Sequence, residues 1–418
     1  MARRGFDFRR VAVTGRLLIL CLAVAVVSSC AISVRPSTSD AVSASGSVAA
    51  TIPPPWTAAA LTTNEMSARD RAEIDAVALD ALAQEGDGAT ALYIGFWDPV
   101  RGVYLRAYGE SSPGVAATLG DHNRIGSVTK TFTSVAVLEL VAEGRVKLTD
   151  TMATALPDLS ATFPAIAPLT VDQLLGMRTG IGDFFCCPNG FTNTFYADPT
   201  RGFSIDDLVG FALAMRTPPP VAPTTADYSN TNYVILGELI RVITGRPASE
   251  VITDVARSVG LRDSALPEDG EQRLPEPAAN GYMGPHFITE HDELLPSASP
   301  VLTDVSDWIP IGAGAAAGMY STVGDLGAWA ATGFGSALLP SDLVNARLSP
   351  PGGEDFAYGY GIVRVGADWL GHGGSVDGWV IDTAFNRATG AAWVMIVNSS
   401  GGEGVLQAVA KFRPAFSP

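Results

Sequence analysis

The segment from Arg124 to Lys130 places a hydroxyl, on Ser127, and an amine, on Lys130, three residues apart where a helix begins. Side chains at that spacing lie on one face of a helix. The run from Val128 to Leu140 carries few charges, which predicts a helix that is buried nearly all round, and Gly144 supplies a stop. The chain must therefore fold around a buried lysine.

Burial changes what this lysine can do. Desolvation disfavours the charged form of a lysine, so Lys130 can lose its proton near neutral pH and take one from Ser127, whose hydroxyl is a weak nucleophile unaided. The alternative is a helix N-cap serine beside a lysine that reaches solvent, because short motifs often match by chance. The other lysines in the chain are Lys147 and Lys411 alone. The pair is a candidate activated nucleophile, and partners elsewhere in the chain must decide between the two interpretations.

Composition limits the class of protein. The chain has 418 residues, 47% of them hydrophobic and 17% charged, which is typical of a folded protein with one large domain or two. Its formal net charge of -16 would repel phosphate backbones, so we expect no nucleic-acid partner. The composition leaves the oligomeric state open.

The N-terminus has the pattern of an export signal. Arginines precede an apolar run from Leu17 to Val27, which is too short to span a bilayer but suits a signal peptide, predicted as residues 1–29. Both Arg3-Arg4 and Arg9-Arg10 also allow the twin-arginine route, so the export pathway stays open.

A cysteine follows this predicted signal directly. The sequence Val27-Ser28-Ser29-Cys30 resembles the lipobox of bacterial lipoproteins, which predicts lipidation of Cys30 and a membrane anchor outside the cytoplasm. The alternative is an ordinary signal peptide with an incidental cysteine. Residues 30–60 are rich in Ser, Ala and Pro and are predicted to form a tether.

The elements expected along the chain change character twice. Segments rich in β-forming residues flank a middle part in which helical segments alternate with loops rich in Pro and Gly. This order predicts an α/β domain built from residues 61–147 and 310–418, with a mainly helical domain at 148–309. The expected strands are residues 91–97, 102–108, 358–365, 379–386 and 392–398.

A second polar group occurs at Tyr228-Ser229-Asn230, just before an expected helix at residues 232–244. A phenol titrates near pH 10 in water, but an adjacent ammonium favours its anion, so Tyr228 could act as a base and then as an acid toward a leaving group. Asn230 offers both a donor and an acceptor. The alternative is that Ser229 and Asn230 are turn and cap residues.

A third group is His372-Gly373-Gly374-Ser375, which lies between strand candidates near the C-terminus. The two glycines let the backbone come close to a ligand, and the backbone N–H of Ser375 could face a developing oxyanion. The alternative is a glycine turn with an exposed histidine.

In this order, Ser-x-x-Lys, Tyr-x-Asn and His-x-Gly resemble the marks of the serine β-lactamase and penicillin-binding protein superfamily. The resemblance is to its class C-like branch, with D-alanyl-D-alanine carboxypeptidases and esterases. It extends through residues 174–180, 228–237 and 317–322 and covers roughly residues 70–415. It implies an antiparallel sheet flanked by helices plus a helical domain, with no cofactor or metal.

The resemblance also assigns expected roles to residues. Ser127 would be the acylated nucleophile, Lys130 its activating neighbour and Tyr228 the proton shuttle. Asn230 would hold a substrate amide, and His372 would line the far wall beside Gly373 and Gly374. The backbone N–H groups of Ser127 and Ser375 would form the oxyanion hole. The expected partner is a small-molecule or peptidoglycan-like substrate, namely a β-lactam, a D-alanyl-D-alanine peptide or an ester.

Two departures from the family pattern affect this expectation. His372 replaces the commoner lysine, and a largely neutral imidazole attracts a substrate carboxylate less than an ammonium does. This favours an ester over a β-lactam or a D-alanyl-D-alanine peptide. Met177 and Thr179 stand where relatives often carry His and Ser.

Other functions explain less of the sequence. A Ser-His-Asp enzyme could use His372, Ser375 and Asp377, but the chain has no Gly-x-Ser-x-Gly elbow. His286 and His291 are wrongly spaced for a His-Glu-x-x-His metal site. The chain could also be an exported binding lipoprotein that does not turn over a substrate. Such a protein would not need Ser127, Lys130, Tyr228 and Asn230 together. The adjacent cysteines, Cys186 and Cys187, are interpreted as structural or incidental.

Overall fold

The computed structural model describes residues 60–84, 87–185, 190–268, 270–271, 273–285, 302–308, 314–349 and 356–414. The predicted signal peptide and Cys30 lie outside these residues, as do Cys186, Cys187, His286 and His291. Within the described residues, no helix is both long enough and apolar enough to cross a membrane. Export and lipidation therefore stay predictions.

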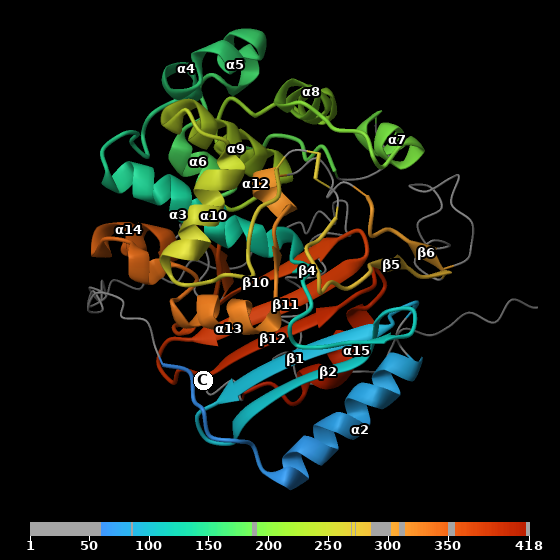
Figure 1. Cartoon of the computed structure of the whole chain (residues 1–418). Coiled ribbons are helices and arrows are strands. Elements are labelled where there is room, and N and C mark those ends of the chain that lie inside the picture. Colours follow the sequence, from blue (N-terminus) through green and yellow to red (C-terminus); the bar gives the residue numbers. More distant parts are fainter. Residues whose placement is uncertain are drawn as a thin grey trace, which may run out of the picture.

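The described chain forms one large antiparallel sheet of eight strands in the order β3-β2-β1-β12-β11-β10-β9-β8 (Figure 1). Strand β1 pairs with β12 over its length, with Leu92 opposite Val397 and Trp97 opposite Ala392, so the two ends of the chain share a sheet. This confirms the predicted α/β class. The strands are β1 (Ala91–Asp98), β2 (Gly102–Ser112), β3 (Val115–Ala116), β8 (Phe356–Tyr358), β9 (Val363–Val365), β10 (Trp369–Val376), β11 (Trp379–Asn386) and β12 (Ala392–Val397).

The strand predicted at residues 358–365 is wrong, because this segment holds two short strands joined by a turn. Gly359 donates its N–H to the carbonyl of Ile362 at 2.8 Å, and Gly361 has a φ of +67°. Only glycine adopts such a φ at little cost, so the two glycines turn the chain between β8 and β9.

The His372 segment is not a turn between strands. It lies inside β10, where Gly373 pairs with Asp382 of β11. Glycine weakens a strand unless another backbone comes close to it. A Cβ on Gly374 would lie 2.2 Å from the carbonyl oxygen of Ile125, so this glycine is required by close packing against the segment that carries Ser127.

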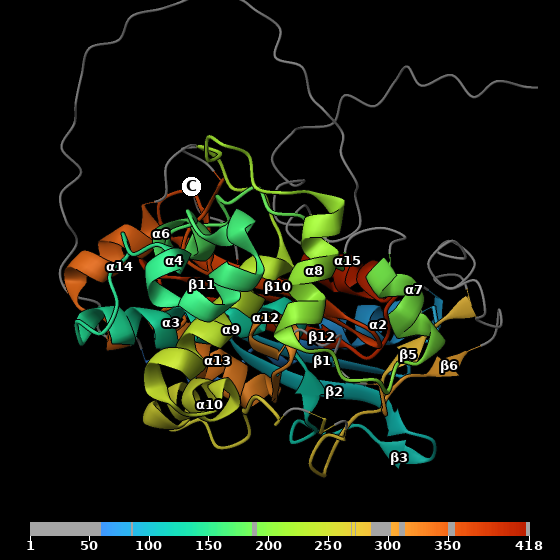
Figure 2. The ribbon, with the colours of Figure 1, turned by 90° about the horizontal axis from the view of Figure 1, so that it is seen from above.

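Helices cover both faces of the sheet (Figures 1 and 2). One face carries α2 (Ala68–Gln84) and α15 (Glu403–Ala410), which pack against each other and against the sheet. The other face carries the remaining helices. Among the described residues they are η1 (Gly126–Val128), α3 (Thr129–Ala142), α4 (Met152–Ala155), α5 (Pro157–Thr162), η2 (Pro164–Ile166), α6 (Val171–Leu175), α7 (Gly190–Ala197), α8 (Ile205–Met215), α9 (Asn230–Thr244), α10 (Ala248–Ser258), α12 (Gly314–Ala317), α13 (Val323–Ala331), η3 (Ser336–Leu338) and α14 (Ser341–Leu348).

The middle of the chain is mainly helical where it is described. Between residues 148 and 309, its described strands are the two-residue pair β5 (Tyr282–Met283) and β6 (Thr303–Asp304). Another two-residue pair, β4 (Asn123–Arg124) with β7 (Tyr320–Ser321), ties the segment before Ser127 to the segment before α13. The domain boundaries themselves stay a prediction.

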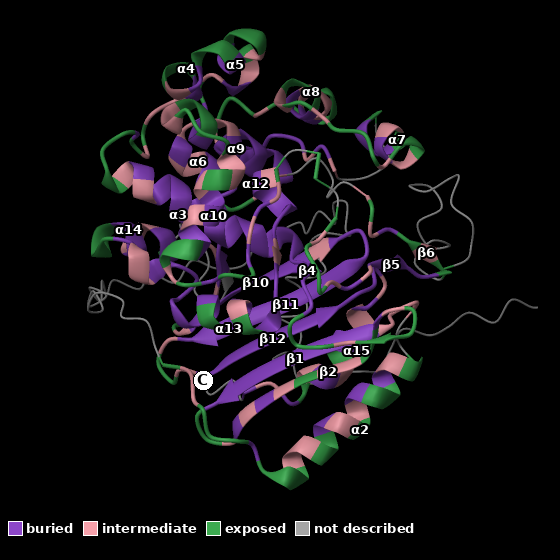
Figure 3. Cartoon of the chain, viewed as in Figure 1, coloured by how far each residue is buried: buried purple, intermediate pink, exposed green. Residues whose placement is uncertain are grey.

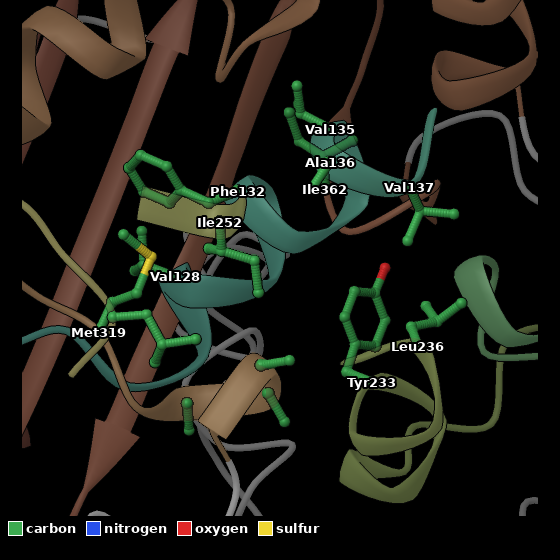
Figure 4. Packing of buried hydrophobic residues seen from close by; sticks show 14 of the residues in the cluster. Val128, Phe132, Val135, Ala136, Val137, Tyr233, Leu236, Ile252, Met319 and Ile362 are labelled. Atoms are coloured by element: carbon green, nitrogen blue, oxygen red, sulfur yellow. The ribbon is translucent and has the colours of Figure 1, made fainter. Parts of the chain in front are cut away.

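Helix α3 lies on the face of the sheet opposite α2 and α15, and its residues from Thr129 to Leu138 are all buried (Figure 3). Val128 and Phe132 lie near Ile252 of α10, whereas Val137 lies near Tyr233 of α9 (Figure 4). Contact on all sides fixes the position of α3, and with it the direction in which Lys130 leaves the helix.

Polar side chains on this buried helix are hydrogen-bonded. Thr133 donates to the carbonyl of Ala315 at 2.6 Å, and Thr131 accepts from the indole of Trp329 at 2.8 Å. The fully buried Arg347 donates to Ser134 at 3.2 Å. Buried polar groups cost free energy unless they are paired, so these contacts make an enclosed helix with several hydroxyls stable.

Candidate active site

Ser127 lies where the backbone of η1 meets the backbone of β10. Gly126 has a φ of +50°, and a Cβ at this position would lie 2.8 Å from the backbone nitrogen of Ser375. Gly374 makes the matching close approach from the strand side. Both glycines are therefore needed for the segment that carries Ser127, which is 4% exposed, to pack against the backbone of β10 at Ser375.

Lys130 is fully buried, and its Nζ atom has three oxygen neighbours. It lies 2.9 Å from Ser127 Oγ, 2.7 Å from Asn230 Oδ1 and 2.9 Å from the carbonyl oxygen of Ala316. An ammonium can donate to all three oxygens. A neutral amine can donate to Asn230 and Ala316 and present its lone pair to the hydroxyl of Ser127. Both protonation states are therefore fully hydrogen-bonded.

Burial lowers the pKa of Lys130 to about 7, and the negative charge of Asp183 opposes this shift. The cause is the loss of hydration, which disfavours the ammonium. At neutral pH the charged and neutral forms of Lys130 are then both populated, which is the condition for accepting a proton from a neighbour.

Asp183 is a site residue that the sequence analysis missed. It is half-buried, and it accepts hydrogen bonds from Asn230 Nδ2 at 3.0 Å and from the backbone N–H of Phe185 at 3.1 Å. Burial raises the pKa of Asp183, while these hydrogen bonds and the charge of Lys130 act to lower it. Asn230 thus turns its oxygen to the lysine and its nitrogen to the carboxylate.

No spacing pattern pointed to Asp183, because it does not touch Ser127. One general signal was available: a lysine buried in an apolar helix needs a compensating charge nearby. Asp183 follows the segment 174–180, which carries part of the family resemblance. That position, together with the need for a negative charge, would have made it a candidate.

Tyr228 donates a hydrogen bond from its phenol to Ser127 Oγ at 2.9 Å. The expectation that the neighbouring lysine favours the phenolate is wrong. Burial raises the pKa of Tyr228 well above its usual value, and the charge of Asp183 raises it further. Lys130 Nζ lies over the face of the ring, 4.9 Å from its centroid. The phenol therefore keeps its proton at neutral pH.

His372 is buried in β10, at 6% exposure, and both of its ring nitrogens have partners. Nδ1 lies 2.6 Å from the carbonyl oxygen of Gly373, so Nδ1 carries the proton, and Nε2 accepts from the phenol of Tyr358 at 3.2 Å. Burial lowers the pKa of His372 to about 3, and Lys130 adds to this shift. The imidazole is neutral, and it does not form a triad with Ser375 and Asp377.

Met177 and Thr179, the two departures from the family pattern, support the start of α9. The amide of Asn232 donates to the sulfur of Met177 at 3.3 Å and accepts from the hydroxyl of Thr179 at 2.6 Å. Asn232 lies on α9, two residues beyond Asn230. The pair therefore holds the segment that presents Tyr228 and Asn230.

Ser127, Lys130, Tyr228 and Asn230 thus share one hydrogen-bond network, although they come from distant parts of the sequence. The ring of His372 lies 6.4 Å from the ring of Tyr228 between centroids, and the strand residues Gly373, Gly374 and Ser375 continue past Ser127. Among the residues that the structure describes, no three side chains of His, Cys, Asp or Glu gather in the manner of a metal site.

Two curated proteins are similar to parts of the chain. The chain is 28% identical over 204 residues to penicillin-binding protein 4 of Amycolatopsis lactamdurans, covering 45% of this chain and 51% of that protein. It is 31% identical over 133 residues to Protein flp of Staphylococcus aureus, covering 31% of this chain and 25% of that protein. The chain thus spans about half, or a quarter, of the length of these relatives.

Solved structures extend the likeness to the whole fold. The D-stereospecific amidohydrolase from Streptomyces sp. superposes with a TM-score of 0.68 at 26% identity, covering 83% of this chain and 99% of that one. The D-amino acid amidase from Ochrobactrum anthropi SV3 gives 0.63 at 25% identity, covering 81% and 98%.

The family model described as Beta-lactamase matches residues 79–413, which includes every described residue of the hydrogen-bond network around Ser127. Together with the antiparallel sheet and the amidohydrolase and penicillin-binding relatives, this match shows that the chain belongs to the β-lactamase family of serine hydrolases.

Proposed function

We propose that the chain is an exported hydrolase of small amides or esters, in which Ser127 is acylated and Lys130 is the base. The observation that carries this proposal is the surroundings of Lys130 Nζ, which satisfy the ammonium and the free amine equally well. A group that must gain and then lose a proton benefits when neither form is left unpaired in a dry site.

In the first step, the Ser127 oxygen attacks the carbonyl carbon of the substrate while its proton passes to the neutral amine of Lys130. The C=O electron pair moves to the oxygen, which the backbone N–H groups of Ser127 and Ser375 stabilise. Collapse of this intermediate expels the leaving group, which takes a proton from the phenol of Tyr228. Tyr228 recovers a proton from Lys130, which regenerates the free amine.

Water then attacks the acyl-enzyme with the same groups acting in reverse. The free amine of Lys130 takes up a proton through the phenol of Tyr228, which gives its own proton to the amine as it accepts one from the water. Lys130 then returns a proton to the Ser127 oxygen as the acid product leaves. Asn230 keeps the amine aligned, because Asp183 fixes the orientation of its amide. Each proton that leaves Ser127 or water is thus returned within one cycle.

The neutral His372 bears on the type of substrate. Without a cation at this position, the site gains little from a free carboxylate on the substrate, which supports amides and esters that lack one. Two similar structures carry the names D-stereospecific amidohydrolase and D-amino acid amidase, which supports an amide or ester over a β-lactam. We place the enzyme outside the cytoplasm, anchored through Cys30, because of the N-terminal sequence.

A labelling experiment tests the nucleophile. The purified chain is incubated with a fluorophosphonate, and the adduct is located by mass spectrometry of the peptides. We expect one adduct on Ser127, absent in Ser127→Ala and retained in Ser134→Ala, a control at a buried serine on the following helix α3. An intact, folded chain that forms no adduct, or one labelled elsewhere, would overturn the proposal.

A further inference from the structure

Asp377, directly after β10, is a buried carboxylate that the proposed mechanism does not use. It is 9% exposed, and its Oδ1 accepts a hydrogen bond from the phenol of Tyr196 at 3.4 Å. Its Oδ2 atom has no hydrogen-bond partner among the residues that the structure describes. Buried polar atoms are nearly always paired, so this oxygen calls for an explanation.

Two other carboxylates, those of Asp382 and Asp183, have the hydrogen-bond partners that Asp377 lacks among the described residues. Asp382 accepts from the guanidinium of Arg413 at 2.7 Å and from the indole of Trp393 at 3.2 Å. Asp183 is bonded by the side chain of Asn230 and by backbone N–H groups. At Asp377, burial raises the pKa to about 7, and the hydrogen bond from Tyr196 is the only opposing influence in the described structure. Among the described residues, Asp377 thus has neither the cation that contacts Asp382 nor the amide that contacts Asp183.

The position of Asp377, in the turn directly after β10, places it near the proposed reacting groups. His372, three residues before Ser375, lies beside Tyr228, the proposed proton donor to the leaving group. The backbone of Ser375 packs against Gly126, next to the nucleophile, and Asp377 follows two residues later in the turn between β10 and β11, so its Cα lies within about 7 Å of that of Ser375. A substrate whose leaving group faces Tyr228 therefore directs its acyl part toward Asp377.

The surroundings of Asp377 suit an organic cation. Tyr196, which bonds Asp377, contacts Trp308 edge to face with ring centroids 6.1 Å apart, and both side chains are half-buried. A carboxylate beside aromatic rings attracts an ammonium through both charge and the ring faces. The net charge of -16 adds a general attraction for cations.

We infer that Asp377 binds the free ammonium group of the acyl donor, so that the substrates are amides or esters of amino acids with an unblocked amine. This inference rests on the proposed function and specifies its substrate class. The scissile carbonyl would lie close to the backbone of Ser375, two residues before Asp377, so an amine on the next carbon lies within reach of the Asp377 side chain. Charge-assisted hydrogen bonds of this kind are worth roughly tenfold to a hundredfold in kcat/KM.

The test compares two substrates that differ only in the amine. Hydrolysis of phenylalanine amide, as both the D- and the L-form, is measured beside that of 3-phenylpropanamide, with the matching p-nitrophenyl esters as faster substrates. For the wild-type chain we expect kcat/KM to favour the amine by roughly tenfold or more. In Asp377→Asn that ratio should fall at least fivefold, whereas Asp368→Asn, an equal change of net charge on the surface, should keep it.

The outcomes separate this inference from the proposed function. If the wild-type chain hydrolyses the deaminated ester as fast as the amine, or Asp377→Asn keeps the wild-type ratio, the ammonium site is wrong and the hydrolase stands. If neither substrate reacts and fluorophosphonate labels nothing, the proposed function fails. The wild-type ratio decides the question even where Asp377→Asn does not fold.

Discussion

The two faces of the sheet each bury a cation close to a carboxylate, but in different ways. On the face covered by α2 and α15, Arg413 contacts Asp382 directly at 2.7 Å and lies over the ring of Trp393. On the opposite face, Asn230 stands between Lys130 and Asp183. The first arrangement is a direct ion pair, and the second is an ion pair divided by an amide.

The difference explains why one site can carry protons and the other cannot. A guanidinium keeps its proton in proteins, and a carboxylate in direct contact strengthens that preference. With an amide between the charges, Asp183 stabilises the ammonium of Lys130 less, so burial still lowers the pKa of Lys130 to about 7. We conclude that the sheet face with the divided pair is arranged for chemistry, and the other for stability.

The largest effect is expected from replacing Lys130. Lys130→Met should lower kcat/KM for a p-nitrophenyl ester by about 10²–10⁴, because the base is lost. The melting temperature should change little, since relief from burying an ammonium offsets the lost hydrogen bonds. Lys130→Arg should also be inactive, because a guanidinium does not release its proton. Activity within threefold of wild type in either variant would remove Lys130 from the mechanism.

The opposite face should respond in stability and not in activity. Arg413→Met leaves Asp382 buried without its cation, which should cost about 3 kcal/mol in the free energy of unfolding. Denaturant unfolding measures this cost, and ester hydrolysis at 20 °C measures activity. Unchanged stability, or a loss of kcat/KM in a chain that is still folded, would contradict the conclusion that this face contributes stability and the opposite face contributes catalysis.

Asp183→Asn probes the divided pair itself. The carboxylate of Asp183 raises the pKa of Lys130 against the effect of burial, so its removal should lower that pKa. Because the free amine is the reactive form, the rising limb of kcat/KM against pH should move to lower pH. Relative to the plateau, the rate at pH 5.5 should increase roughly threefold to tenfold. A limb that stays in place, or moves to higher pH, would show that Asp183 does not act on Lys130.

The sequence predicted those parts of the molecule that depend on local spacing. Helical spacing placed Ser127 and Lys130 on one face, and in the structure their polar atoms lie 2.9 Å apart. Strand patterns at both ends of the chain predicted a shared α/β domain, and β1 does pair with β12. Such features follow from the spacing of apolar and polar residues, with a period of two in strands and 3.6 in helices, and this spacing is visible in the sequence.

The remaining parts depend on burial and on contacts between distant segments. Gly373 and Gly374 made β10 look like a turn, because the backbone that packs against Gly374 belongs to Ile125. The rise in the pKa of Tyr228 depends on burial depth, which motif spacing does not reveal. Asp183 acts through Asn230, so no pattern around Ser127 includes it. Asp377 was considered for a triad, whereas its actual partner is Tyr196.

The smallest effect concerns His372, a buried titratable group on the same face as Lys130. Burial lowers the pKa of His372 to about 3, so the imidazole is neutral and does not change charge between pH 5 and 8. His372→Gln keeps a donor for Gly373 and an acceptor for Tyr358, and kcat/KM should stay within about threefold with the same pH profile. His372→Lys should instead improve hydrolysis of substrates with a free carboxylate relative to neutral esters.

If His372→Gln removes an inflection near pH 6.5, the imidazole titrates in the wild-type chain and carries charge in the working range. The imidazole would then join Lys130 and Asp377, whose pKa values both lie near 7, as a third group on this face that exchanges a proton near neutrality. For an ester without an amine, which does not engage Asp377, an unchanged profile leaves Lys130, with its three satisfied contacts, to account for the pH dependence of the enzyme.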